Sequence, residues 1–251
     1  MYPITEIFGV KLITFPIIGF LALTVCVFLL LFANKFKSCR SDFIVFRLIF
    51  VAILGAAIGG RLLSAITLIL SSDNGFVYNI IHGGSVFYGG LVGSALGLYI
   101  VCKFNHLDYL FYTDTFATLL PLAQAFGRIG CYCNGCCYGM KTLSHFSVPY
   151  IVDGVRVQVF PTWFVESFFC LILFIVLYNC NLWDARGART SIYLISYAVF
   201  RFVIEFYRGD YIRGYVGMLS SSQIISVLIL VIAVPVTVNH IRKNTMEGEA
   251  D

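Results

Sequence analysis

An apolar run of this chain ends in the segment Gly127-Arg128-Ile129-Gly130-Cys131-Tyr132-Cys133-Asn134-Gly135-Cys136-Cys137-Tyr138-Gly139. Arg128 stands where lipid tails would normally be, and the segment then continues as a loop rich in glycine and cysteine. A charge inside a membrane is costly, so it usually pairs with another charge or lines a wet cavity. The segment therefore indicates a polar site embedded in a membrane protein.

The composition agrees with a membrane location. The 251 residues are 59% hydrophobic and 12% charged, whereas a soluble domain carries about 25% charged residues. A helix that crosses a bilayer needs about 20 mainly apolar residues. Such runs lie at roughly 13–34, 43–70, 86–103, 109–130, 163–182, 190–208 and 222–240. We expect an all-α polytopic membrane protein with about seven transmembrane helices, forming one transmembrane domain over residues 1–251.

The longest non-apolar segment, 131–162, predicts a small cap over one end of the helices. It contains two β-type pieces, 151–152 and 155–159, joined by Asp153-Gly154, which is a hairpin turn signal. The net charge is +4 and the basic residues are scattered singly, so nucleic acid is not an expected partner.

Lysine and arginine predict the orientation of the chain in the membrane. With seven helices, one side collects Lys35, Lys37, Arg40, Arg47, Lys103, Arg186, Arg189, Arg242 and Lys243. The opposite side holds only Lys11, Lys141, Arg156 and Arg213. The positive-inside rule then places the C-terminus in the cytoplasm, and the N-terminus and the 131–162 cap outside.

In that topology four predicted helices bring charges to one outer level of the bilayer. These charges are Arg61, Arg128, Glu166, Arg201, Glu205 and Arg208. Such charges predict a shared polar cavity that opens outward. For Glu166, the position after Pro161-Thr162 favours a plainer role near the start of a helix, where an acid stabilises the helix dipole.

Arg201, Glu205 and Arg208 follow one another at i, i+4 and i+7, so we expect them on one helix face. One interpretation is a structural ion-pair ladder. The other is an anion site, in which guanidiniums fork onto phosphate oxygens and Glu205 orients them. At this level of a membrane, the abundant phosphate is a phospholipid headgroup.

The glycine pairs of Gly83-Gly84-Ser85-Val86-Phe87-Tyr88-Gly89-Gly90 also have two interpretations. They allow a ligand to approach the backbone at a helix N-terminus, or they allow two helices to pack closely. The cysteines of 131–137 have three interpretations: a metal or iron–sulfur half-site, a disulfide between Cys133 and Cys136, or plain packing residues.

Taken in order, these motifs resemble those of the prolipoprotein diacylglyceryl transferases over nearly the whole chain. The matching elements are Gly60-Arg61, the glycine pairs at 83–90, the 127–139 segment, Pro161 with Glu166, Arg201 with Glu205 and Arg208, and Leu219-Ser220 with Gln223. The resemblance implies a multi-pass enzyme of the bacterial plasma (inner) membrane. Such an enzyme transfers the diacylglyceryl group of phosphatidylglycerol to the lipobox cysteine thiol of a prolipoprotein signal peptide, and glycerol 1-phosphate leaves.

The resemblance also implies roles for individual residues. Arg128, Arg201, Glu205 and Tyr88 are the expected catalytic residues. The expected substrate-binding residues are Arg61, Gly89, Gly90, Asn134, Gly139 and Arg208. Phosphatidylglycerol and other membrane lipid, and prolipoproteins, are the expected partners, and no metal or cofactor is expected.

The chain departs from the family pattern at five positions, one of which is Trp163, in place of the polar residue expected two positions after Pro161. Ile18 stands where the family has a tyrosine, and Tyr88 stands where it often has a histidine. A phenol, with a reference pKa of about 10, is a poor general base unless its environment shifts it strongly. Cys131 and Cys136 replace an asparagine and an acid. Two alternatives therefore stay open: a relative that acts on another lipid or acceptor, and a phospholipid-binding membrane protein without enzymatic activity.

Overall fold

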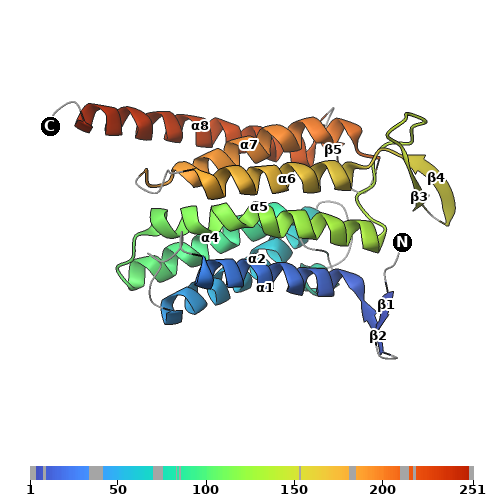
Figure 1. Cartoon of the computed structure of the whole chain (residues 1–251), viewed down its shortest axis with the longest axis horizontal. Coiled ribbons are helices and arrows are strands. Elements are labelled where there is room, and N and C mark those ends of the chain that lie inside the picture. Colours follow the sequence, from blue (N-terminus) through green and yellow to red (C-terminus); the bar gives the residue numbers. More distant parts are fainter. Residues whose placement is uncertain are drawn as a thin grey trace. The chain divides into compact units, whose positions relative to one another are not determined.

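The computed structural model describes residues 4–7, 10–33, 42–69, 76–82, 84, 86–152, 154–180, 185–209, 215–216 and 219–248. Its α-helices are α1 (Thr14–Phe32), α2 (Asp42–Ile69), α3 (Phe76–His82), α4 (Phe87–Phe104), α5 (Tyr109–Asn134), α6 (Thr162–Asn179), α7 (Ala188–Ile204) and α8 (Ser221–Gly248) (Figure 1). Three antiparallel hairpins pair β1 (Ile4–Ile7) with β2 (Val10–Ile13), β3 (Val148–Val152) with β4 (Val155–Val159), and β5 (Tyr215–Val216) with β6 (Leu219–Ser220).

Six of the described helices are long and apolar enough to cross a membrane: α1, α2, α4, α6, α7 and α8. Large apolar side chains on them are exposed, for example Phe20 at 72% and Phe50 at 67%, as expected for surfaces that face lipid. The remaining predicted span, 109–130, corresponds to α5, which carries Asp114, Gln124 and Arg128 along its length. The chain is a helical multi-pass membrane protein, which confirms the predicted fold class.

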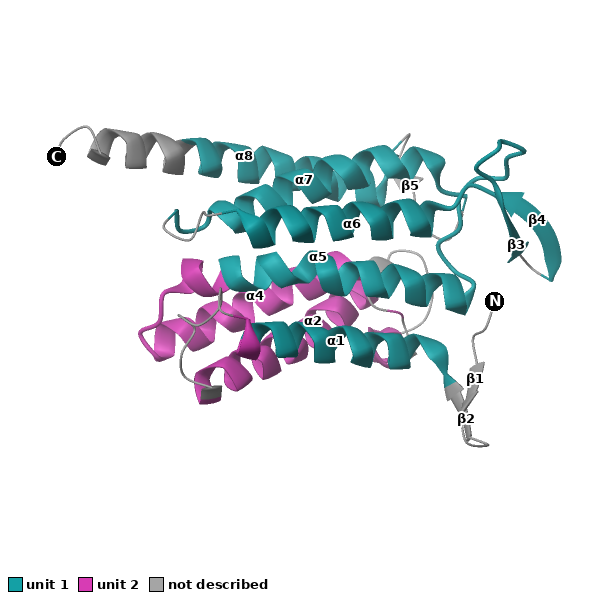
Figure 2. Cartoon of the chain, in the orientation of Figure 1, with its two compact units in different colours: residues 1–30, 114–251 teal, residues 31–113 magenta. Residues whose placement is uncertain are grey.

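The described residues form two compact units, which Figure 2 colours separately: residues 1–30 with 114–251, and residues 31–113. We refer to them as unit 1 and unit 2. The organisation of residues 1–251 as one transmembrane domain stays a prediction.

Unit 2 is held together by glycines in the contact between α2 and α4. A Cβ atom added to Gly55 would collide with the carbonyl oxygen of Gly93, and one added to Gly59 would collide with that of Gly89. The hydroxyl of Ser94 donates a hydrogen bond to the carbonyl oxygen of Ala52 across the same contact (2.8 Å). Small residues at such interfaces let two membrane helices approach closely enough for their backbones to touch.

Replacing Gly93 by valine is expected to force these helices apart. Overpacking of this kind lowers the free energy of unfolding by about 1–3 kcal/mol. The measurement is denaturant unfolding of the purified protein in detergent. Gly19→Val is the matched control because no atom lies within 4 Å of the position of an added Cβ there. Equal losses of stability for the two variants would contradict the packing role.

In unit 1, helices α5, α6 and α7 share a core. Its buried members are Ala117, Ala125, Cys170, Leu173, Leu177, Tyr193 and Tyr197. Asp114 of α5 accepts hydrogen bonds from the backbone N–H groups of Gly187 and Thr190 and from the Thr190 hydroxyl (2.8, 2.8 and 2.6 Å). A carboxylate at these N–H groups stabilises the first turn of α7. These contacts fix the three helices that carry the main charged residues of the site.

The hairpin predicted within the cap segment is confirmed, with β3 and β4 paired antiparallel and Gly154 in the left-handed backbone conformation (φ 80°). The predicted end of the 190–208 helix is wrong. Helix α7 ends at Ile204, a 3-10 turn η2 (Glu205–Tyr207) follows, and Arg208 forms an isolated bridge with Gly139. Arg208 therefore does not share a helix face with Arg201 and Glu205.

Candidate active site

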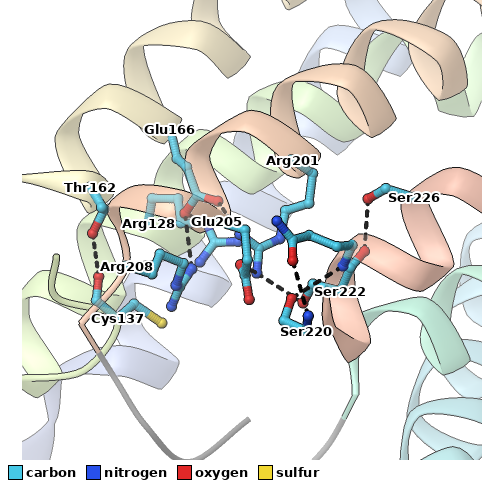
Figure 3. Close-up of polar contacts among 11 residues, drawn as sticks. Arg128, Cys137, Thr162, Glu166, Arg201, Glu205, Arg208, Ser220, Ser222 and Ser226 are labelled. Carbon is cyan, nitrogen blue, oxygen red and sulfur yellow. Dashed lines mark hydrogen bonds and ion pairs between the residues drawn. The ribbon is translucent and has the colours of Figure 1, made fainter. Parts of the chain in front are cut away.

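Glu166 lies at the centre of a buried cluster of charges in unit 1 (Figure 3). Its Oε2 atom lies 2.9 Å from Nε of Arg128 and 3.6 Å from a terminal nitrogen of Arg208. Its Oε1 atom lies 3.4 Å from a terminal nitrogen of Arg201, and Arg201 also pairs with Glu205 at 2.8 Å. We call these five residues the arginine–glutamate cluster.

The cluster draws on three segments of the chain: Arg128, Glu166, and residues 201–208. Arg128 is near the end of α5, Glu166 is in the second turn of α6, and Arg201 is in the last turn of α7. Glu205 opens the 3-10 turn that follows α7. The pairing of Arg201 with Glu205 has the predicted i, i+4 spacing.

Residues at the start of helix α8 supply a polar contact to Arg201. The Gln223 side chain accepts a hydrogen bond from the N–H of Ser220 (2.9 Å), and the Ser220 hydroxyl accepts one from the N–H of Gln223 (3.2 Å). This reciprocal arrangement is a capping box, which fixes the start of a helix. It places Ser222 so that its hydroxyl accepts a hydrogen bond from Arg201 (3.1 Å).

Charge and burial in the cluster favour an anion as its ligand. The cluster contains three guanidiniums and two carboxylates, so it carries one net positive charge in a buried environment. The side chain of Arg128 is 18% exposed, against 5% for Arg201 and 2% for Arg208. Because Arg128 bonds Glu166 through Nε, it is the arginine best placed to offer its terminal nitrogens to phosphate oxygens.

The loop after α5 is joined to the cluster by backbone contacts. Gly139 donates its N–H to the carbonyl oxygen of Phe160 (3.1 Å), and an added Cβ at Gly139 would collide with that same oxygen. The N–H of Gly209 donates to the carbonyl oxygen of Tyr138 (3.1 Å). Only glycine fits at position 139, where the chain passes between Phe160 and the residues around Arg208.

Three cysteines lie together where α5 ends and the loop begins. The Sγ atoms of Cys131, Cys136 and Cys137 all lie within 4.8 Å of one another. Hydrogen bonds from the Cys131 and Cys136 thiols, together with the nearby Arg208 and Arg128 guanidiniums, hold the pKa of the Cys137 thiol well below its ordinary value. Cys137 is the thiol of the three whose pKa is lowered, and Arg208 and Arg128 lie near it.

The remaining predicted site residues divide between the two units. Asn134 is the last residue of α5, in unit 1, and its side chain hydrogen bonds to Cys136. Arg61, Tyr88, Gly89 and Gly90 belong to unit 2. Gly89 is buried against Gly59, and Gly90 against Ala56, so the glycines do serve helix packing. Their part in substrate binding stays a prediction, as do the roles of Arg61 and Tyr88.

Glu166 was among the charges expected at the shared polar cavity, but neither it nor Ser222 was among the predicted catalytic or substrate-binding residues. Glu166 is not in the first turn of α6, as expected for a dipole-stabilising acid, but one turn later, where it contacts three arginines. Ser222 has no individual sequence signal. The sequence does contain a signal for Glu166. It is an acid within an apolar run, no basic residue stands four positions before or after it, and it therefore needs a basic partner from another helix.

Known proteins resemble this chain over nearly its full length. A family model described as prolipoprotein diacylglyceryl transferase matches residues 3–239. A Clostridium tetani protein named phosphatidylglycerol–prolipoprotein diacylglyceryl transferase is 35% identical over 236 residues, which cover 91% of this chain and 93% of its own. A Clostridium perfringens protein of the same name, with the suffix 2, is 34% identical over 233 residues and 90% of each chain.

Proposed function

Because the chain belongs to the prolipoprotein diacylglyceryl transferase family, we propose that it transfers the diacylglyceryl group of phosphatidylglycerol to prolipoprotein. The acceptor is the thiol of the lipobox cysteine. The carbon–oxygen bond between the diacylglyceryl group and the phosphate breaks, a carbon–sulfur bond forms, and glycerol 1-phosphate leaves.

The observation that carries the proposal is the arginine–glutamate cluster with its net positive charge. The leaving phosphate gains negative charge as the carbon–oxygen bond breaks, and guanidiniums already held in place stabilise that charge without reorganising. Glu166 holds three arginines in fixed positions. A cluster of this kind acts on the leaving group and leaves the acceptor thiol to be activated elsewhere.

Within the cluster, Arg128 binds the phosphate because it is the most exposed of the three arginines. Arg201 assists it, and Glu205 with Ser222 fixes the Arg201 guanidinium. Arg208 contacts the same carboxylate oxygen of Glu166 as Arg128 does and helps to hold it in place.

The residues outside the cluster have supporting roles. Asn134 and Gly139 shape the loop that follows Arg128. In unit 2, Arg61, Gly89 and Gly90 contact the lipid substrate, and Tyr88 hydrogen bonds to a reacting group.

We propose that the protein lies in the bacterial plasma (inner) membrane, with its N-terminus outside and its C-terminus in the cytoplasm. The basic residues between the predicted helices support this orientation. The site then opens on the side where secreted prolipoproteins emerge, and both substrates reach it from within the bilayer.

The test is a transfer assay with purified protein, phosphatidylglycerol labelled in its acyl chains, and a synthetic lipobox peptide. We expect label on the peptide, and none on a matched peptide with serine in place of the lipobox cysteine. Label on the serine peptide would favour a different acceptor. Phospholipid bound to active preparations without any labelled product would favour the binding-protein alternative and refute the proposal.

A further inference from the structure

The three clustered thiols of unit 1 are not used by the chemistry of the arginine–glutamate cluster. Cys131 lies in the last turn of α5, and Cys136 and Cys137 follow in the loop. All three are partly buried, and their Sγ atoms lie within 4.8 Å of one another. Cys133 belongs to the same segment but not to this group.

The loop is held in the conformation that brings the thiols together. The Tyr150 hydroxyl donates a hydrogen bond to the carbonyl oxygen of Cys136 (2.9 Å), and the Thr162 hydroxyl donates one to that of Cys137 (2.7 Å). Cys137 has a φ of 60°, a left-handed conformation that side-chain-bearing residues seldom adopt. Such strain persists only where the surroundings enforce it, and it is concentrated at functional sites.

The spacing of the thiols suits a metal ion. Zinc–sulfur bonds of about 2.3 Å in tetrahedral geometry place two sulfurs about 3.8 Å apart. The separations between the three Sγ atoms lie within about 1 Å of that value. Rotation of the cysteine side chains is enough to bring the sulfurs to the distance that zinc requires. Three thiolates around a divalent ion carry one net negative charge, and Arg208 and Arg128 act on Cys137 with the opposite charge.

We propose that Cys131, Cys136 and Cys137 bind a thiophilic divalent cation, zinc in particular, and leave one coordination position open. No fourth cysteine, histidine or carboxylate joins the group among the described residues. Three protein ligands with a fourth position for water or substrate is the pattern of catalytic zinc, whereas structural zinc has four protein ligands.

The role of the ion rests on the proposed function. A transferase that forms a thioether must remove the proton of the acceptor thiol, and both carboxylates of the cluster are already bound to arginines. A thiol that coordinates zinc loses its proton to solvent. Its sulfur then attacks the glycerol carbon that bears the phosphate, the carbon–oxygen electron pair leaves with glycerol 1-phosphate, and the oxidation state of zinc is unchanged.

The site is tested by metal binding to the full-length protein in detergent. The protein is stripped with a chelator, loaded with Zn²⁺ or Co²⁺ and freed of excess metal. We expect about one ion per chain and, with cobalt, thiolate-to-metal charge-transfer absorption. Cys131→Ser, Cys136→Ser and Cys137→Ser are each expected to weaken binding at least about tenfold. Cys133→Ser is the matched control and should bind as the unchanged protein does.

A second measurement uses the unchanged protein, so it does not depend on the folding of variants. Zn²⁺ is expected to slow alkylation of Cys131, Cys136 and Cys137 at least about tenfold, as mapped by mass spectrometry, and to leave Cys133 unaffected. Equal alkylation with and without Zn²⁺, or a disulfide within the three, would overturn the site.

Transfer assays separate this proposal from the proposed function. The stripped protein is expected to lose transfer and to regain it with Zn²⁺. Full transfer by the stripped protein would overturn the role of zinc and leave the transferase function standing. Zinc bound with the expected stoichiometry but no transfer under any condition would refute the transferase function and leave the site standing.

Discussion

Glu166→Gln is expected to abolish measurable diacylglyceryl transfer and to destabilise the protein. The substitution leaves the carboxylate of Glu205 alone to face three buried guanidiniums. Breaking a buried ion pair from one side costs about 3–5 kcal/mol, because an uncompensated charge remains in a medium of low polarity. Transfer is measured with labelled phosphatidylglycerol, and stability by denaturant unfolding in detergent.

Glu205→Gln is the matched comparison, since it makes the same chemical change at the other carboxylate of the cluster, which pairs with Arg201. It should lower stability less than Glu166→Gln does. If the two variants were equally stable, the central position of Glu166 in the arginine–glutamate cluster would be refuted.

Arg128→Ala is expected to lower kcat by a factor of about 10²–10³. That is the loss usually seen when one donor to a developing negative charge is removed. Arg128→Lys should recover little of it, because an ammonium group cannot fork onto two phosphate oxygens while also keeping the contact that Nε of Arg128 makes with Glu166. The assay is the same transfer reaction, run at saturating phosphatidylglycerol so that kcat is separated from KM.

Arg156→Ala is the control for this loss. Arg156 is an exposed arginine on β4, away from the ion pairs of the cluster. Its removal should leave kcat within about twofold, as expected for a surface substitution. Similar losses for Arg156→Ala and Arg128→Ala would mean that the assay reports overall charge and not a phosphate contact.

The membrane helices follow directly from the sequence because each apolar run must hydrogen bond its own backbone in lipid. The turn at Asp153-Gly154 predicts the hairpin for a similarly local reason. The pairing of Arg201 with Glu205 depends only on helical periodicity. In each case the information lies within a few residues of the feature that it determines.

Local patterns do not predict the contacts of Glu166, Arg208 and the three thiols, because these contacts join segments that lie far apart in the sequence. The three arginines that meet Glu166 come from positions 128, 201 and 208, so their convergence depends on how separate segments pack. Arg208 lies beyond the end of α7 and forms a bridge with Gly139. No pattern in the neighbouring residues predicts that bridge. The thiols converge because Tyr150 and Thr162 hold the carbonyl groups of their loop.

The claim that the arginine–glutamate cluster binds the phosphate of the lipid is tested most directly by a structure with phosphatidylglycerol bound. We expect phosphate oxygens within hydrogen-bond distance, about 2.7–3.2 Å, of the terminal nitrogens of Arg128. The ion pair between Arg128 and Glu166 should remain in place. A phosphate bound elsewhere, with Arg128 contacting only Glu166, would contradict the account.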